Sequence, residues 1–221
     1  MKGFRKFFAA AGTMFLIAGC GDKPQRMPVY VLPWYNSKPF DIQVGRFSDD
    51  LKSDDPQQLL GTAEKIRSQI GSMPVEALYV LAIRLYDVGE KDEAVYWFYT
   101  AQFRRNLFAR MVLSDDGVGN PAFECEKAQT AFNKLSGKWI NGYAGGAADK
   151  WLETLSRVID EGPRGGYIGT AYPDLTFRPE PEQAAVAHGI ARELAALRQY
   201  IMDNREEMAR ARKENGIEGK Y

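Results

Sequence analysis

Over most of the chain, apolar residues recur among polar ones with the period of an α-helix. Within this part, large apolar residues recur at spacings of three and four, which places them on one face of an α-helix. Asp55 before Pro56 marks a helix start, and Gly71 and Gly89 each end an apolar run. The last helical segment is highly charged after Met202, and its helix is expected to fray there. The segments with the helical pattern are 56–71, 74–88, 90–104 or beyond, 121–136, 147–160 and 181–202. They predict an all-α fold, an irregular helical bundle.

The segment before these helices has a different pattern. Residues 40–44 alternate apolar and polar positions, which is the period of a β-strand, and nearby prolines restrict this region to extended conformations. We therefore expect an extended arm at residues 28–47, followed by a helical domain at 48–215 and a short tail at 216–221. Four aromatic residues of the arm are expected to lie against the helices: Tyr30, Trp34, Tyr35 and Phe40.

The first nineteen residues differ in composition from the rest of the chain. Lys2, Arg5 and Lys6 give a cationic start, and residues 7–19 are apolar or small apart from Thr13. A cationic start, an apolar stretch of this length and a small-residue exit are typical of a secretory signal peptide. The apolar run is shorter than the about 20 residues that a membrane-spanning helix needs. Residues 1–19 are therefore predicted to be a signal peptide.

The apolar run ends in four residues that form a motif: Ile17, Ala18, Gly19 and Cys20. They resemble the bacterial lipobox, an aliphatic and two small residues before a cysteine. The resemblance implies cleavage before Cys20, acylation there, and a tether at residues 20–27 to the bilayer. The next residue is not the aspartate that retains lipoproteins in the inner membrane of enteric bacteria, so the resemblance favours the outer membrane, facing the periplasm. The alternative is an ordinary secretory signal with a cysteine at its cleavage site.

Charge and cysteine content limit the remaining possibilities. The full chain has 29 basic and 29 acidic residues, so loss of the cationic signal leaves a net charge of about −3. No basic face is implied, and we expect no nucleic-acid partner. With Cys20 lipidated, Cys125 is the single remaining thiol, so we expect no disulfide within the domain. The remaining chain, about 200 residues, is long enough for one domain with its own core.

One of the expected helical hairpins carries a recognisable pattern of large and small residues. The pattern consists of Leu78, Leu81, Ala82, Leu85, Ala94, Phe98 and Ala101. It resembles a tetratricopeptide repeat and is similar to the related Sel-type repeat, and the resemblance implies a protein-binding module. Leu78, Leu85 and Asn106 replace the tryptophan, tyrosine and proline of the tetratricopeptide pattern, and we find no second copy. A generic helical hairpin inside an irregular bundle is therefore the alternative.

Few residues offer catalytic or metal-binding chemistry. His188 is the only histidine, and no pair of histidines or cysteines has the spacing of a structural zinc site. Cys125 is flanked by two glutamates, which disfavour a thiolate, so we interpret it as an inert thiol. The acidic stretch 115–120 is interpreted as a polar turn in which Asn120 caps the next helix, rather than as a calcium loop. We expect no catalytic residue, no metal and no cofactor beyond the lipid on Cys20.

The connection formed by residues 162–179 is too long to be a simple turn. The segment is rich in glycine but matches neither common phosphate-loop spacing. It also carries the residue types that dominate protein-binding hot spots: Arg164, Tyr167, Tyr172, Phe177 and Arg178. We expect these residues, together with Trp34 and Tyr35 of the arm, to form a recognition surface. The alternative is that the aromatic residues pack back onto the protein's own helices.

These observations favour a lipid-anchored, periplasmic helical module that binds another protein of the cell envelope. One alternative, by analogy with other small lipoproteins, is an immunity or inhibitor lipoprotein that neutralises a toxic envelope-targeting enzyme. A third possibility is a carboxylate-based cell-wall hydrolase, which needs a deep pocket with two facing carboxylates about 5–10 Å apart. The expected partners are therefore the bilayer, through the acyl anchor, and one envelope protein.

Overall fold

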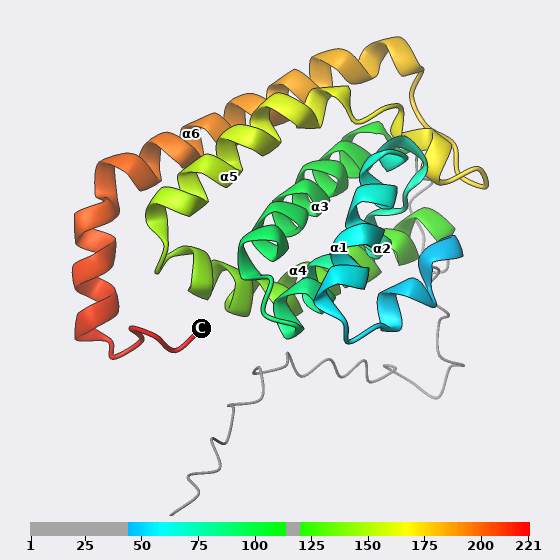
Figure 1. The fold of residues 1–221 in the computed structure, drawn as a ribbon. Coiled ribbons are helices and arrows are strands. Elements are labelled where there is room, and N and C mark those ends of the chain that lie inside the picture. The colour runs from blue at the N-terminus through cyan, green and yellow to red at the C-terminus, as the bar shows by residue number, and fades with distance from the viewer. Residues whose placement is uncertain (1–43, 114–119) are drawn as a thin grey trace, which may run out of the picture.

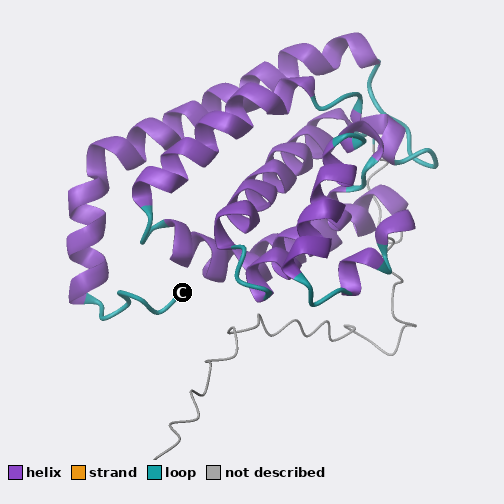
Figure 2. Cartoon of the chain, viewed as in Figure 1, coloured by secondary structure: helices purple, strands orange, loops and turns teal. Residues whose placement is uncertain are grey.

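Helices account for most of the described chain (Figures 1 and 2). The computed structural model describes residues 44–113 and 120–221. Its α-helices are α1 (Pro56–Arg67), α2 (Val75–Asp87), α3 (Lys91–Met111), α4 (Pro121–Ala144), α5 (Ala148–Glu161) and α6 (Glu180–Glu214). Within these ranges the only β-type pairing is an isolated antiparallel bridge between Val112 and Phe177. The prediction of an all-α bundle is confirmed.

The signal peptide, the lipobox with Cys20, the tether and nearly all of the arm, including Trp34 and Tyr35, lie outside the described residues. The described end of the predicted arm is not extended. Residues Gly45–Phe47 form a short 3-10 turn, η1, because the buried Phe47 ring turns inward to the helical core. A second 3-10 turn, η2 (Asp50–Lys52), brings in the buried Leu51. None of the helices in the described segments is long and apolar enough to cross a membrane.

Helix α3 is the centre of the bundle. It packs against α2, α4, α5 and α6, and every residue from Ala94 to Ala101 is buried. In Figure 1, α5 and α6 run side by side along one side of α3, and α1 and α2 lie on the other. A helix surrounded in this way has no polar face along its middle, which explains why its sequence is apolar and aromatic all round.

The hairpin with the repeat-like pattern consists of α2 and α3. They share the most extensive contact of any two helices, and every residue of the pattern is fully buried. Gly89, at φ +94°, makes the turn between them. Helix α4 packs on both α2 and α3. A generic hairpin has the same local structure, so the tetratricopeptide resemblance stays a prediction.

Helix starts agree with the sequence better than helix ends. Asp55 accepts a hydrogen bond from the Gln57 amide at 2.9 Å, and Asn120 accepts one from the Ala122 amide at 2.8 Å, as expected for N-caps. The prediction that the first helix continues to Gly71 is wrong. The helix ends at Arg67, and η3 (Ile70–Ser72) follows it.

The last helix is longer than predicted, and its charged half does not fray. Arg205 forms a salt bridge with Asp149 at 3.0 Å, and Arg212 donates to the Gly142 carbonyl at 2.8 Å. The segment predicted as a tail is also attached, because the Tyr221 ring packs edge-on against Trp139 at 5.9 Å between centroids. Helix α4 likewise extends past its predicted end, to Ala144. Side-chain contacts with distant elements therefore hold these segments in place, although their sequences no longer show the apolar period of a helix.

Candidate functional site

Residues 162–179 form an ordered segment on the surface of the helices. It contains two short 3-10 turns, η4 (Gly162–Arg164) and η5 (Ile168–Ala171), and its Ile168 side chain is fully buried. Gln183, at the start of α6, accepts a hydrogen bond from the Ile168 amide at 2.8 Å and donates to the Gly166 carbonyl at 2.9 Å. These two bonds pair backbone groups that a loop otherwise leaves unsatisfied.

Two of the predicted recognition residues pack their rings against α3. Tyr172 is 8% exposed and its ring lies 4.8 Å from that of Phe108, between centroids. Phe177 is partly buried, and its ring lies 5.5 Å from the same phenylalanine. The prediction that Tyr172 contacts a partner is therefore wrong, because its ring packs onto α3, which was the alternative. Phe177 also packs onto α3, but it keeps some exposed surface, so its role in recognition stays a prediction.

The Tyr172 hydroxyl also has an internal role. It donates to Glu76 Oε2 at 2.8 Å and accepts hydrogen bonds from the Val75 amide at 2.8 Å and from Gln129 Nε2 at 3.2 Å. A phenolic oxygen has one donor and two acceptor positions, and all three are used here. Burial raises the pKa of Glu76, although its own amide, Tyr172 and Gln129 bond to the carboxylate. We refer to Glu76, Gln129 and Tyr172 as the tyrosine tie.

The remaining predicted residues are accessible. Arg164 and Arg178 are exposed, and Tyr167 is half-buried, with its hydroxyl donating to the Arg178 carbonyl at 2.7 Å. Arg164 and Tyr167 line an open groove of about 380 Å³. The opposite wall of the groove is the connection between α1 and α2, residues 68–72. We call this feature the loop–turn groove.

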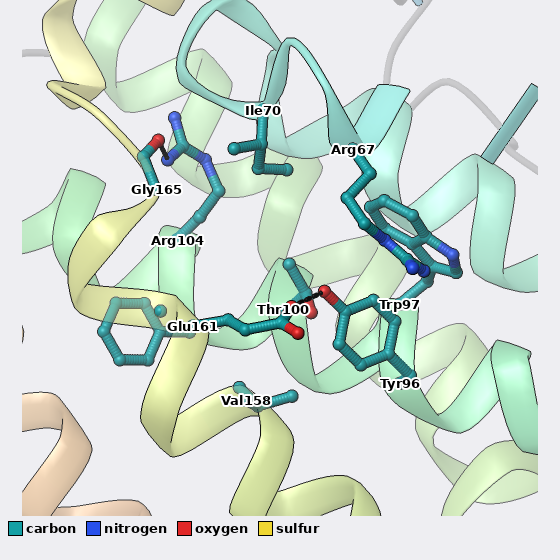
Figure 3. Close-up of a pocket in the computed structure, with 11 residues that line it drawn as sticks. Arg67, Ile70, Tyr96, Trp97, Thr100, Arg104, Val158, Glu161 and Gly165 are labelled. Atoms are coloured by element: carbon teal, nitrogen blue, oxygen red, sulfur yellow. Dashed lines mark hydrogen bonds between the residues drawn. The ribbon is translucent and has the colours of Figure 1, made fainter. Parts of the chain in front are cut away.

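A second, smaller cavity lies against the loop–turn groove (Figure 3). It has a volume of about 50 Å³ and lies between the end of α1, η3, the middle of α3 and the end of α5. Ile70 and Gly165 line both spaces, so the two are neighbours. We call it the inner cavity.

Arg104 of α3 stands at the junction of the two spaces. It is 2% exposed and donates from Nη1 to the Gly165 carbonyl at 2.7 Å and from Nη2 to the Gly71 carbonyl at 3.3 Å. It therefore fastens the loop to the α1–α2 connection. Burial lowers the pKa of Arg104 to about 10, which leaves the guanidinium charged at neutral pH. We refer to Arg104 with these two carbonyls as the arginine tie.

The other end of the inner cavity contains a paired charge network. Arg157 contacts Glu161 at 3.2 Å and Glu93 at 3.3 Å, and Arg67 contacts Glu93 at 3.2 Å. Burial acts to raise the pKa of Glu161, but hydrogen bonds from Tyr96, at 2.6 Å, and from Arg157 outweigh it, so the pKa is lowered. A hydrolase acid needs a raised pKa. The carboxylate lining this cavity therefore does not supply that acid.

Neither the thiol nor the histidine lines the inner cavity or the loop–turn groove. Burial, followed by the charges of Glu76 and Glu124, raises the pKa of the Cys125 thiol to about 11. His188 is exposed on α6, and no hydrogen bond joins it to Cys125 in the described structure. Among residues 44–113 and 120–221, no three histidine, cysteine or acidic side chains gather in the way that a metal ion requires.

Comparison with known proteins gives little guidance. No family model matches the chain. It is similar to an uncharacterized protein of Haemophilus influenzae (strain Rd), with 26% identity over 140 residues, which is 60% of this chain and 53% of that protein. The chain thus matches about half the length of this curated relative. No solved structure matches the chain.

Proposed function

We propose that this protein is a bacterial lipoprotein, anchored through lipid on Cys20 and facing the periplasm, whose helical domain binds another protein of the envelope. The observation that carries the proposal is the sequence Ile17-Ala18-Gly19-Cys20 at the end of a cationic and apolar leader. Gly21 in the position after the cysteine favours the outer membrane over the inner one.

The proposed partner-binding surface is the loop–turn groove together with Arg164, Tyr167 and Arg178. Arginine and tyrosine are among the residue types that contribute most to protein interfaces, and here they belong to a segment that hydrogen bonds hold at Gly165 and at Tyr172. A surface that is already ordered loses little conformational entropy on binding. The groove adds hydroxyl and glycine backbone groups, which can form hydrogen bonds with a partner's main chain.

The anchor is tested by replacing Cys20. Cys20→Ser removes the only thiol that the lipobox offers, so labelling with radioactive palmitate is lost and the amount in the membrane fraction falls. Cys125→Ser, the matched control, retains both labelling and membrane association, because that thiol lies in α4. A Cys20→Ser chain that fractionates with membranes at wild-type levels would contradict the proposal.

The binding surface is tested by cross-linking and affinity capture from bacterial envelopes, with mass spectrometry of the captured proteins. Arg164→Ala/Arg178→Ala is expected to reduce recovery of the main partner at least about tenfold, the effect of losing about 1.4 kcal/mol of binding. The control is Arg192→Ala/Arg210→Ala, which removes two exposed arginines from α6. Equal recovery with both double variants would exclude this surface. The identity of the partner distinguishes an envelope component from a toxic enzyme.

A further inference from the structure

The arginine tie has a charge that the described protein does not neutralise. Arg104 is almost fully buried, and it forms no salt bridge with a carboxylate in residues 44–113 or 120–221. Its two Nη bonds go to neutral carbonyls, and its Nε has no hydrogen-bond partner in the same described ranges. A buried charge without a counter-charge is costly, and an unpaired buried N–H adds to that cost. Both facts indicate a missing acceptor beside Arg104.

The inner cavity offers room for such an acceptor. Arg104 lines it, and so does Arg67, whose buried Nε is also unpaired within the described structure. The volume of about 50 Å³ exceeds the about 10–15 Å³ that a single water molecule needs. It is large enough for a small ion and a water molecule, but too small for a metabolite or a peptide side chain with its backbone. In Figure 3, Arg104 lies beside Gly165 at one end of this space.

The acidic residue in the cavity does not provide the counter-charge. Glu161 lines the same space, but its two carboxylate oxygens are engaged by Tyr96 and Arg157. Figure 3 shows its hydrogen bond with Tyr96 at the end away from Arg104. The Arg104 end of the cavity therefore keeps the positive charge of the guanidinium and its unpaired Nε donor.

We propose that the inner cavity binds a monovalent inorganic anion of the size of chloride, with Arg104 as its main ligand. The anion supplies the counter-charge to the guanidinium and accepts the hydrogen bond from Nε. Because the same guanidinium holds the Gly165 and Gly71 carbonyls, the anion also strengthens the attachment of the loop to the α1–α2 connection. Binding is linked to folding, since the site exists only in the folded chain.

The test uses thermal unfolding of the full-length chain in a non-ionic detergent. Sodium chloride is exchanged for sodium gluconate at constant ionic strength, because gluconate is too large for the cavity. Above half-saturation, the midpoint is expected to rise by about 3–5 °C for each tenfold increase in chloride. Equal midpoints in chloride and gluconate at every concentration would overturn the proposal and indicate water alone in the cavity.

A variant locates the effect. Arg104→Met removes the charge and the donors at similar length, and is expected to abolish the difference between chloride and gluconate. Arg105→Met changes the net charge equally, but Arg105 bonds to Thr130 at 3.1 Å and does not line the cavity, so the chloride effect is retained. A chloride effect that persists in Arg104→Met would overturn the proposal.

Crystallography with bromide covers the case in which Arg104→Met does not fold. Wild-type crystals grown in sodium bromide are expected to show an anomalous difference peak in the inner cavity beside Arg104. Density there without an anomalous signal would be water, and would contradict the proposed anion.

Discussion

The loop at residues 162–179 is held at two places by buried polar groups of opposite charge. At the tyrosine tie, the Glu76 carboxylate lies in the first turn of α2 and is bonded by Tyr172 and Gln129. At the arginine tie, Arg104 is bonded only to backbone carbonyls within the described residues. Both ties involve α3, because Arg104 belongs to it and the Tyr172 ring packs against its Phe108.

The difference lies in how the charge is compensated. Glu76 receives hydrogen bonds from neutral donors and stands at a helix N-terminus, where a negative charge is favoured. Arg104 has no such compensation inside the described chain and has a cavity beside it. The tyrosine tie is therefore complete on its own, whereas the arginine tie depends on a ligand. The stability of the tyrosine tie should therefore depend on mutation alone. The stability of the arginine tie should depend both on mutation and on the anions in solution.

The largest effect is expected at the tyrosine tie. Tyr172→Ala removes a buried ring and leaves Glu76, Gln129 and the Val75 amide without their shared partner. It should lower the free energy of unfolding by about 4 kcal/mol and the melting temperature by about 10 °C. Tyr200→Ala, at a tyrosine that is 60% exposed on α6, should change it by less than about 0.5 kcal/mol. An unchanged melting temperature for Tyr172→Ala would show that this ring is not a structural contact.

An intermediate effect is expected where the loop meets the α1–α2 connection. Gly166 has a φ of +74°, and a Cβ there would lie 3.0 Å from the Gly71 Cα. Gly166→Ala should therefore lower the free energy of unfolding by about 2 kcal/mol, as measured by urea denaturation. Gly61→Ala, in the interior of α1 with open space around it, should instead raise it by about 0.5–1 kcal/mol. Equal changes at both positions would contradict the close approach that brings the loop to Gly71.

The smallest effect concerns the charge of Glu76. Because burial raises its pKa in the folded protein, the folded state holds the proton more tightly than the unfolded one. The resulting stabilisation is fully present below the ordinary glutamate pKa of 4.5 and is lost as the pH rises through the raised pKa. Glu76→Gln should change the free energy of unfolding by about 1 kcal/mol or less at pH 7.

Urea denaturation between about pH 4.5 and 8 measures this dependence. The stability of the wild-type chain relative to Glu76→Gln should be constant above the raised pKa of Glu76 and should increase as the pH is lowered through that pKa towards 4.5. A constant difference would mean that folding does not shift the pKa of Glu76, and a difference that grows as the pH rises would mean that folding stabilises the charged carboxylate.

The helical fold could be predicted because its signals are local. The spacing of apolar residues and the caps at Asp55 and Asn120 depend only on neighbouring positions. The ends of helices were less predictable where distant contacts determine them. The first helix ends before Gly71, which lies against Gly166. The hydrogen bond from Arg212 to Gly142 holds the charged end of the last helix. Neither contact leaves a periodic signal in the sequence.

The candidate site was only partly predictable, because the same residue types serve interfaces and cores. Tyr172 and Phe177 have the composition of a hot spot, yet they pack inside, whereas Arg164 stays exposed. Arg104 and Glu76 were missed altogether. Their only signal is a charged residue on a helix with mostly apolar neighbours one turn away, as Ala101, Leu107 and Phe108 are for Arg104. The sequence alone favours an exposed position for such a residue, and only the packing of the helices shows that it is buried.

The proposed location of the helical domain and its loop in the envelope depends on Cys20 becoming the lipid-bearing first residue of the mature protein. The most direct measurement is mass spectrometry of the N-terminal peptide from protein purified out of bacterial membranes. The predicted result is a peptide that begins at Cys20 and carries a diacylglyceryl group on the thiol and an acyl chain on the amino group. A mature chain that begins elsewhere, or an unmodified Cys20, would contradict the claim.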